Sequence, residues 1–241
     1  MYTVFLAGGM GSRLSEETHK TPKPMIKIGK HPILFHIMKH YSDFNFKKFI
    51  VCGGYKYLYI KKFFLQNKKL ISNKKFDWDV NIINTGLKAQ TGARIKKIKK
   101  YLKNEKIFFM TYGDGVANVN IKKILNFHKK HKKIATLTAV RPLPRFGNIK
   151  LKKNKVSSFS EKDRLQEGWI NGGFFVLNKE VFDYIDDRQN CIFEKEPLQN
   201  LSKNGQLMAY KHEGFWHPMD TLRDKNYLNE LWKKKKLSWL K

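Results

Sequence analysis

The chain has few acidic residues, few cysteines and no long apolar run. Twenty aspartates and glutamates stand against 49 lysines and arginines in 241 residues, for a formal net charge of +29. No apolar run approaches the roughly 18 residues of a membrane-spanning helix, so we expect no membrane partner. Cys52 and Cys191 match no metal-binding spacing and favour a reduced, cytoplasmic compartment. The short apolar run near the N-terminus has no basic segment before it, so we expect no signal peptide.

The excess of positive charge raises the alternative of a polyanion-binding protein. The basic residues are spread along the chain and are mostly lysine, without zinc-finger spacing, a G-x-x-G clamp or basic-zipper heptads. The densest run, residues 233–236, follows an amphipathic stretch and is typical of a solvated helix end. We therefore expect no nucleic-acid partner, and a non-catalytic polyanion-binding role remains a remote alternative.

Hydrophobic periodicity alternates between strand and helix patterns along the chain. It predicts strands at residues 2–7, 48–52, 80–84, 107–112 and 134–140, and helices at 33–41, 57–65, 94–102 and 121–131. The second half is richer in strands, at 148–151, 155–160 and 174–177, before a final helix near 222–233. This alternation predicts an α/β fold with a mostly parallel central sheet flanked by helices, in one domain over residues 1–241.

The first predicted strand stops at a glycine-rich segment that is suited to phosphate. Glycine permits positive φ angles and close backbone approach, and successive N–H groups in such a turn bind anions. Arg13 adds a planar set of donors, and Lys23 is held on a stiff segment between Pro22 and Pro24. The spacing is neither that of a P-loop nor that of a dinucleotide fingerprint, because Leu14 stands where a third glycine would be needed. The segment predicts a triphosphate site rather than a bare surface turn.

Two aspartates are candidate ligands for Mg²⁺. Asp114 lies between two glycines at the end of a predicted strand, and Asp220 lies just before the predicted final helix. Mg²⁺ is typically held by one or two carboxylates together with substrate phosphates. Each aspartate has a structural alternative, which is an Asp-Gly turn for Asp114 and a helix N-cap for Asp220.

Three other segments carry groups that suit a phosphorylated sugar or a base. Glu161 and Lys162 could hold hydroxyls and a phosphate, although exposed Glu-Lys pairs are common. The segment 171–173 lets a ligand approach the backbone or is an ordinary turn before a strand. Residues 91–94 could read a base edge, or Thr91 could cap a helix. His36 and His128 lie in predicted helices and are expected to be structural.

The order of these motifs resembles that of the sugar-1-phosphate nucleotidyltransferases, and finer matches resemble the glucose-1-phosphate cytidylyltransferases among them. The general motifs are Leu6-Ala7-Gly8-Gly9-Met10-Gly11-Ser12-Arg13, Pro22-Lys23-Pro24, Gly113-Asp114-Gly115, Glu161-Lys162 and Asn171-Gly172-Gly173. The finer ones include Leu14-Ser15-Glu16-Glu17-Thr18, Thr111-Tyr112-Gly113-Asp114-Gly115-Val116-Ala117, Arg145-Phe146-Gly147 and the segment from Gly214 to Lys225. The likeness covers nearly the whole chain.

The resemblance implies a Rossmann-like nucleotidyltransferase fold that uses Mg²⁺, CTP and α-D-glucose 1-phosphate and releases CDP-glucose, a precursor of surface-polysaccharide sugars, and pyrophosphate. In the family the sugar phosphate attacks the α-phosphorus in line, without a covalent intermediate. It also implies a homo-oligomer, and a division into residues 1–140, mainly for nucleotide, and 141–241, mainly for acceptor.

By position, the resemblance assigns the following roles. The catalytic group would be Arg13, Lys23, Asp114 and Asp220, with the two aspartates holding the metal. The nucleotide would contact Leu6, Ala7, Gly8, Gly9, Gly11, Ser12, Arg13, Thr91, Arg94 and Gly113. The sugar phosphate would contact Gly147, Glu161, Lys162, Asn171 and Gly172.

The chain departs from the family pattern near the expected base pocket. Ala89 stands where the family usually has a small hydroxyl side chain, and Ala93 where it usually has glycine. The segment 65–79 is shorter than in the typical cytidylyltransferase, and Leu143-Pro144 replaces a more glycine-like approach to Gly147. Another nucleotide or another phosphorylated acceptor therefore remains an alternative.

Overall fold

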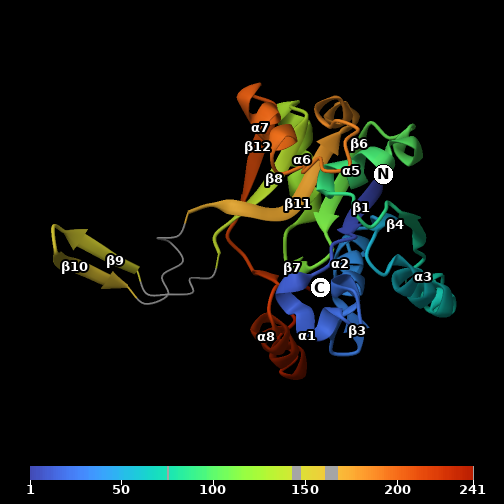
Figure 1. Cartoon of the computed structure of the whole chain (residues 1–241), viewed down its shortest axis with the longest axis horizontal. Coiled ribbons are helices and arrows are strands. Elements are labelled where there is room, and N and C mark those ends of the chain that lie inside the picture. Colours follow the sequence, from blue (N-terminus) through green and yellow to red (C-terminus); the bar gives the residue numbers. More distant parts are fainter. Residues whose placement is uncertain (75, 143–147, 161–167, 241) are drawn as a thin grey trace.

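The protein is described by a computed structural model covering residues 1–74, 76–142, 148–160 and 168–240. Its centre is a seven-stranded sheet with the strand order β12 (Leu207–His212), β8 (Ala135–Val140), β11 (Ile170–Asn178), β6 (Ile107–Tyr112), β1 (Tyr2–Ala7), β4 (Lys48–Gly53) and β5 (Asp79–Asn84) (Figure 1). β11 is antiparallel to both of its neighbours, and the other neighbouring pairs are parallel. The predicted mostly parallel α/β sheet is confirmed.

Alternate side chains of the central strands build two cores, one on each face of the sheet. In β1, Val4 and Leu6 point to one face, and Phe5 and Ala7 point to the other. The Phe5 face is covered by α2 (Ile33–Ser42), α3 (Tyr57–Gln66) and α6 (Ile121–His131). The Val4 face is covered by α5 (Thr91–Lys97) and α7 (Glu196–Lys203). Burial on both faces explains why the central strands read as nearly continuous apolar runs.

Further helices and short strands complete the fold. They are α1 (Ser15–Thr18), α4 (Lys68–Ile71), α8 (Leu222–Lys233) and the paired short strands β2 (Lys27–Ile28) with β3 (His31–Pro32) and β7 (Gly115–Ala117) with β13 (Trp216–Pro218). α1 and α8, from opposite ends of the sequence, lie near each other in Figure 1, and Lys225 of α8 forms an ion pair with Glu17 of α1. The strands β9 (Asn148–Lys152) and β10 (Lys155–Ser160) form a hairpin drawn apart from the central sheet. Within the described ranges, none of the helices has both the length and the apolar character needed to cross a bilayer.

The sequence located most long elements to within two residues, but two predictions need correction. The helix expected at 94–102 starts earlier, at Thr91, and stops being α-helical at Ile98, after which a 3₁₀ turn spans Lys99–Leu102. The strand expected at 174–177 is β11, which starts at Ile170, so Asn171 lies inside a strand rather than in a turn before it. Its pairing with β8 is irregular between Asn171 and Phe175, where Gly173 has a φ of 81°. That irregularity interrupts the alternation by which a strand is recognised.

His36 is buried in α2 and acts as a structural residue, as expected. Its side chain is 1% exposed, and its Nε2 donates to the Ile28 carbonyl at 2.9 Å. Its Nδ1 accepts from the indole N–H of Trp239 at 3.4 Å, which ties the C-terminal segment to α2. The two contacts use the neutral imidazole with its proton on Nε2, and burial lowers the pKa of His36 from 6.5 to about 4.

This histidine predicts a pH dependence of stability. Because the folded pKa lies below the unfolded one, the unfolded chain binds the proton first, and stability is lost as the pH falls from the unfolded pKa of 6.5 toward about 4. Lowering the pH from 7.5 to 5 should therefore remove about 2 kcal/mol from the free energy of unfolding through this histidine. Urea unfolding across this range should show a shallower loss in His36→Gln, whose amide can still donate to Ile28. Equal slopes in the two proteins would contradict this assignment.

Candidate active site

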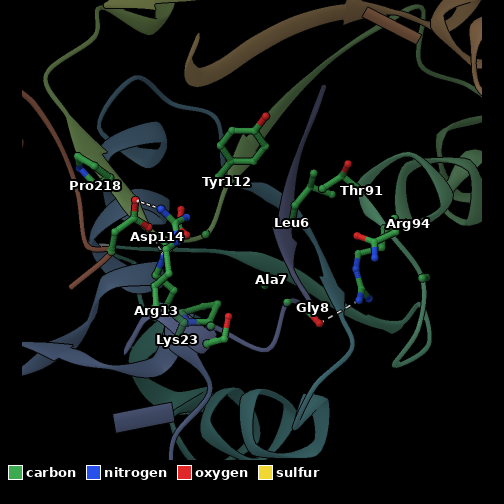
Figure 2. Close-up of a pocket in the computed structure, with 18 of the residues that line it drawn as sticks. Leu6, Ala7, Gly8, Arg13, Lys23, Thr91, Arg94, Tyr112, Asp114 and Pro218 are labelled. Atoms are coloured by element: carbon green, nitrogen blue, oxygen red, sulfur yellow. Dashed lines mark hydrogen bonds and ion pairs between the residues drawn. The ribbon is translucent and has the colours of Figure 1, made fainter. Parts of the chain in front are cut away.

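A cavity of about 480 Å³ opens at the carboxyl ends of β1 and β6, where ligands bind in open α/β sheets. Figure 2 shows Arg13, Lys23 and Asp114 on one side of it and Thr91 and Arg94 on the other. The wall contains most residues that the sequence assigned to the site, namely Leu6, Ala7, Gly8, Gly9, Gly11, Ser12, Arg13, Lys23, Thr91, Arg94, Gly113, Asp114, Asn171 and Asp220. Residues that are far apart in the sequence therefore share one pocket.

A cluster of four charged side chains lies at the base of this pocket. The Lys23 ammonium is 2.7 Å from Asp114 Oδ2 and 2.6 Å from Asp220 Oδ1. Arg13 Nη1 is 2.9 Å from the other Asp220 oxygen. Burial by itself lowers the pKa of Lys23, but the two carboxylates outweigh it and hold that pKa above 10.5. The ammonium is therefore charged at neutral pH and faces both carboxylates.

Asp220 reaches Asp114 through a small antiparallel pair of strands. β7 follows Asp114, β13 precedes Asp220, and the pairing sets Pro218 opposite Gly115. The Met219 N–H then donates to the Asp114 carbonyl at 2.8 Å. Backbone hydrogen bonds therefore bring the two carboxylates to the same lysine, although 105 residues separate them in sequence.

The start of α8 fixes the backbone of Asp220. Thr221 is the N-cap, and its hydroxyl and the Asp224 carboxylate form a capping box. Asp224 Oδ2 also accepts the Asp220 N–H at 3.0 Å. The alternative in which Asp220 caps the helix is wrong, because the next residue does so. Asp114 does lie in a turn between β6 and β7, yet its carboxylate faces Lys23.

The glycine loop is shaped by contacts that only glycine allows. Gly11 has a φ of 68°, and its carbonyl accepts from the Leu14 N–H at 3.0 Å. Gly8 lies against the guanidinium of Arg94, so a β-carbon there would overlap that group. Arg94 Nη2 donates to the Gly8 carbonyl at 2.9 Å, and Nη1 donates to the Thr85 hydroxyl at 2.6 Å. Arg94, only 4% exposed, thus holds the loop in place from behind.

Arg13 has the opposite character. Its side chain is 70% exposed, and it forms an ion pair with Asp220. An exposed guanidinium on a short 3₁₀ turn, Ser12–Leu14, can change partners at small cost. Arg13 therefore fits a phosphate-binding role, whereas Arg94 fits a structural role in the pocket wall, where it holds the glycine loop.

The acceptor side of the site is described only in part. Asn171 lines the pocket, and the Gly172 carbonyl accepts from the Trp216 indole at 2.8 Å. Gly147, Glu161 and Lys162, together with Leu143-Pro144, lie outside the described residues. For the sugar-phosphate group the structure therefore places only Asn171 and Gly172.

Sequence reasoning missed several pocket residues. Pro24, Gln90, Tyr112, Trp216 and Pro218 also line the cavity. Pro24 and Tyr112 adjoin predicted site residues, so the ends of the motifs carried a usable signal. Ala89, one of the departures from the family pattern, is 5% exposed and sits in the wall next to Gln90.

Thr91 is not the helix N-cap, which was its structural alternative. Gln90 occupies the cap position, and Thr91 is the first residue of α5. The Thr91 hydroxyl donates to Glu194 Oε2 at 2.5 Å and accepts from the Phe193 N–H at 2.9 Å. The hydroxyl is therefore engaged with residues of its own chain on the pocket wall.

The carboxylates of the cluster suit a hard cation such as Mg²⁺. Asp114 and Asp220 converge on one positive charge, the Lys23 ammonium, so the chain already places a cation between them. Among the described residues no group of three or more His, Cys, Asp or Glu side chains could hold a metal. Two carboxylates completed by ligand phosphates are the usual donor set for protein-bound Mg²⁺. The residues present fit that ion.

Comparisons with known proteins find similarity over nearly the whole chain. A family model described as "Nucleotidyl transferase" matches residues 2–229. The chain is 47% identical over 254 aligned residues to glucose-1-phosphate cytidylyltransferase of Salmonella typhimurium strain LT2, covering 99% of this chain and 98% of that one. It is 38% identical to the probable glucose-1-phosphate cytidylyltransferase of Bacillus subtilis strain 168, covering 99% of both. The crystal structure of HddC from Yersinia pseudotuberculosis matches with a TM-score of 0.73 at 24% identity, over 96% of this chain and 99% of that one, and so shares the fold.

The contact between Gly8 and Arg94 predicts different outcomes at two neighbouring glycines. In Gly8→Ala the new methyl group must displace a guanidinium that is held by hydrogen bonds, which should lower the free energy of unfolding by about 1–3 kcal/mol. At Gly9 a β-carbon would meet nothing within 4 Å, so Gly9→Ala is the matched control and should stay within about 0.5 kcal/mol of wild type. Urea denaturation measures the free energy of unfolding of both variants. Equal losses in the two would contradict the role of Arg94 in holding the loop at Gly8.

Proposed function

This chain belongs to the nucleotidyl transferase family, and we propose that it transfers a cytidylyl group from CTP to α-D-glucose 1-phosphate, giving CDP-glucose and pyrophosphate. One observation carries the proposal: near full-length similarity to cytidylyltransferases, in a chain whose glycine loop, Lys23, Asp114 and Asp220 share one pocket. The chemistry joins an oxygen of the sugar phosphate to the α-phosphorus and breaks the bond between that phosphorus and the bridging oxygen of the leaving pyrophosphate. The attacking phosphate is already an anion, so no enzyme nucleophile is needed.

The residues of the pocket divide the work of positioning and charge stabilisation. The backbone N–H groups of the glycine loop and the guanidinium of Arg13 bind the triphosphate. Lys23 neutralises the charge that develops around the α-phosphate, and its buried ammonium is most effective there because little water screens it. The loop is already held by Arg94, so little reorganisation accompanies binding.

Asp114 and Asp220 would hold Mg²⁺, which supplies positive charge to the phosphate oxygens when it is bound. The convergence of both carboxylates on Lys23 supports this assignment. With the carboxylates paired to the ion, the Lys23 ammonium would be available to the α-phosphate.

The acceptor assignments rest on the family resemblance together with one described contact region. Asn171 on the pocket wall and Gly172 beside it support an acceptor site on the β11 side. Gly147, Glu161 and Lys162 complete the proposed sugar-phosphate group. The division into a nucleotide-binding part, residues 1–140, and an acceptor-binding part, residues 141–241, remains a prediction.

We also propose that copies of the chain associate and that the protein is cytoplasmic. Association is supported by the β9–β10 hairpin, where Ile149, Leu151, Val156 and Phe159 are each at least half exposed. A cytoplasmic location is supported by the two cysteines, which are free and buried. Light scattering on wild type and on Phe159→Ser tests the association, and an unchanged mass would contradict the role of the hairpin.

The function is tested first by measuring pyrophosphate release. Wild-type protein with Mg²⁺ and glucose 1-phosphate should release pyrophosphate with CTP and far less with UTP, dTTP, GTP or ATP. Preference for another nucleotide would refute the cytidylyl assignment while leaving the reaction class. Silence with all five would refute glucose 1-phosphate as the acceptor.

Lys23→Met should lower kcat by about 100- to 1000-fold, because it removes a buried charge from the reacting phosphate. Lys20→Met is the matched control, since Lys20 is exposed and lies three residues away, and its kcat should be close to wild type. A circular dichroism spectrum like that of wild type confirms that the variant is folded. Near-normal turnover in Lys23→Met would refute its place in the site.

Mg²⁺ should stabilise Lys23→Met more than wild type in a thermal melt without nucleotide. In wild type the ammonium already lies between the carboxylates, whereas in the variant the ion can take that place. Adding Asp114→Asn to Lys23→Met should remove the Mg²⁺ effect, and adding Asp43→Asn, remote from the pocket, should not. Melts that are insensitive to Mg²⁺ in Lys23→Met would contradict the proposed ligand pair.

A further inference from the structure

Glu194 lies behind the pocket wall and joins its two sides, although no motif points to it. It is half-buried, just before α7. Its Oε1 accepts from the Tyr112 hydroxyl and its Oε2 from the Thr91 hydroxyl, both at 2.5 Å. Thr91 and Tyr112 both line the cavity, one at the start of α5 and the other at the end of β6. A single carboxylate therefore links two residues on different elements, 21 positions apart in sequence.

We propose that Glu194 is a positioning residue that orients Asn171 toward the acceptor through the hydroxyl of Tyr112. The inference rests on the proposed function, because it takes Asn171 to be a ligand of the sugar phosphate. Its physical content is the direction of a chain of hydrogen bonds, from Asn171 through Tyr112 to Glu194.

That direction follows from counting donors. The one proton of Tyr112 goes to Glu194, so the phenol oxygen can only accept from Asn171, whose Nδ2 donates to it at 3.1 Å. Asn171 Oδ1 accepts the Gly173 N–H at 2.9 Å. Both ends of the amide are thereby assigned, and a flipped amide would lose both contacts. The amide nitrogen of Asn171 carries two hydrogens. Among the described residues its acceptor is Tyr112, which takes one of them, so the other hydrogen remains for a ligand.

The proton of Tyr112 has a fixed acceptor, because Glu194 Oε1 lies 2.5 Å from the phenol oxygen. The ring is also fixed, because it packs against Gly173, where a β-carbon would overlap it. Gly173 can stay this close because it has no side chain, so the irregular part of β11 and the phenol ring fit together.

The second carboxylate oxygen of Glu194, Oε2, binds Thr91 on the side of the pocket proposed for the nucleotide. Thr91 begins α5, the helix that also carries Arg94, and Arg94 holds the Gly8 carbonyl. Through its two hydrogen bonds Glu194 thus fixes the position of Tyr112 relative to α5, the helix whose Arg94 supports the glycine loop. Bonds from two hydroxyls to one ionised carboxylate are charge-assisted and stronger than neutral ones.

Glutamine cannot reproduce this arrangement. An amide has one acceptor oxygen where the carboxylate has two, so in Glu194→Gln the side chain can accept from only one of the two hydroxyls. Where the amide nitrogen faces Tyr112, it must donate to the phenol oxygen. The phenol proton then turns toward Asn171, and the amide of Asn171 must flip. The substitution keeps the size of the side chain but replaces a carboxylate with a neutral amide, so it changes both the direction and the strength of these hydrogen bonds.

Steady-state kinetics provide the first test. In Glu194→Gln the KM for glucose 1-phosphate should rise about tenfold, with kcat and the KM for CTP changing less than threefold. A role confined to stability would leave both KM values unchanged, and that result would overturn the proposal, as would equal increases in both. The matched control is Glu196→Gln, two residues away on an exposed side chain paired with Arg188, which should behave like wild type.

A double-substitution cycle tests whether the effect passes through Tyr112. In Tyr112→Phe the route is already cut, so adding Glu194→Gln should change the KM for the acceptor little further. Effects that multiply across the two sites would show that Glu194 acts by another path and would overturn the proposal.

A measurement that needs no turnover separates this inference from the proposed function. The side-chain amide of Asn171, identified in ¹H–¹⁵N spectra by its loss in Asn171→Asp, should show one hydrogen-bonded proton in wild type. Both its shift and its exchange rate should change in Glu194→Gln and stay unchanged in Glu196→Gln. If no acceptor is used, the proposed function fails while this signature still decides the role of Glu194. An Asn171 amide indifferent to Glu194→Gln would overturn it.

Discussion

The buried ammonium of Lys23 is the interaction on which the site depends. At 7% exposure it is removed from water, and such a charge is tolerated only with partners of opposite sign. Its two partners come from the turn after β6 and from the residue before the α8 cap. The β7–β13 pairing brings the two aspartates together, and the capping box of α8 fixes the backbone of Asp220. The lysine thus requires three distant segments to meet, and the meeting point becomes the centre of the pocket.

The second requirement is a backbone that can approach a phosphate, and it is met by a different cation. The Arg94 guanidinium donates hydrogen bonds to oxygens of the chain itself, among them the Gly8 carbonyl and the Thr85 hydroxyl. A guanidinium used in this way fixes the loop conformation before any ligand arrives, which lowers the reorganisation needed at the time of reaction. Arg13, exposed beside it on the same loop, keeps its freedom. We propose that these two arginines divide their roles by burial, the buried Arg94 supplying rigidity and the exposed Arg13 binding phosphate.

The sequence predicts the central strands well because they are buried on both faces and their apolar runs end at glycine or polar residues. The helices at 121–131 and 222–233 were predicted with the observed bounds because their apolar spacing is regular. The short strands β7 and β13 have three residues each, too few for a periodic signal, yet they decide where Asp220 lies. Glu194 had no signal either, since its partners are 82 and 103 residues away. What local pattern cannot predict is contact between distant segments, and the family resemblance supplied Asp220 where the pattern alone favoured a cap.

The large positive charge and the charge of the pocket act at different ranges. The net charge of +29 gives the molecule a field that attracts anionic substrates from a distance. Within the charged cluster, however, Lys23 and Arg13 are matched one for one by Asp114 and Asp220. A triphosphate arriving alone would gain the two cations but meet the two carboxylates, which then lose their partners. If Asp114 and Asp220 hold Mg²⁺ as proposed, a triphosphate arriving with that cation would supply a new partner to the carboxylates as it takes the old ones. On this proposal the balanced cluster would favour the metal-bound nucleotide over the free one, a selectivity that the overall charge cannot provide.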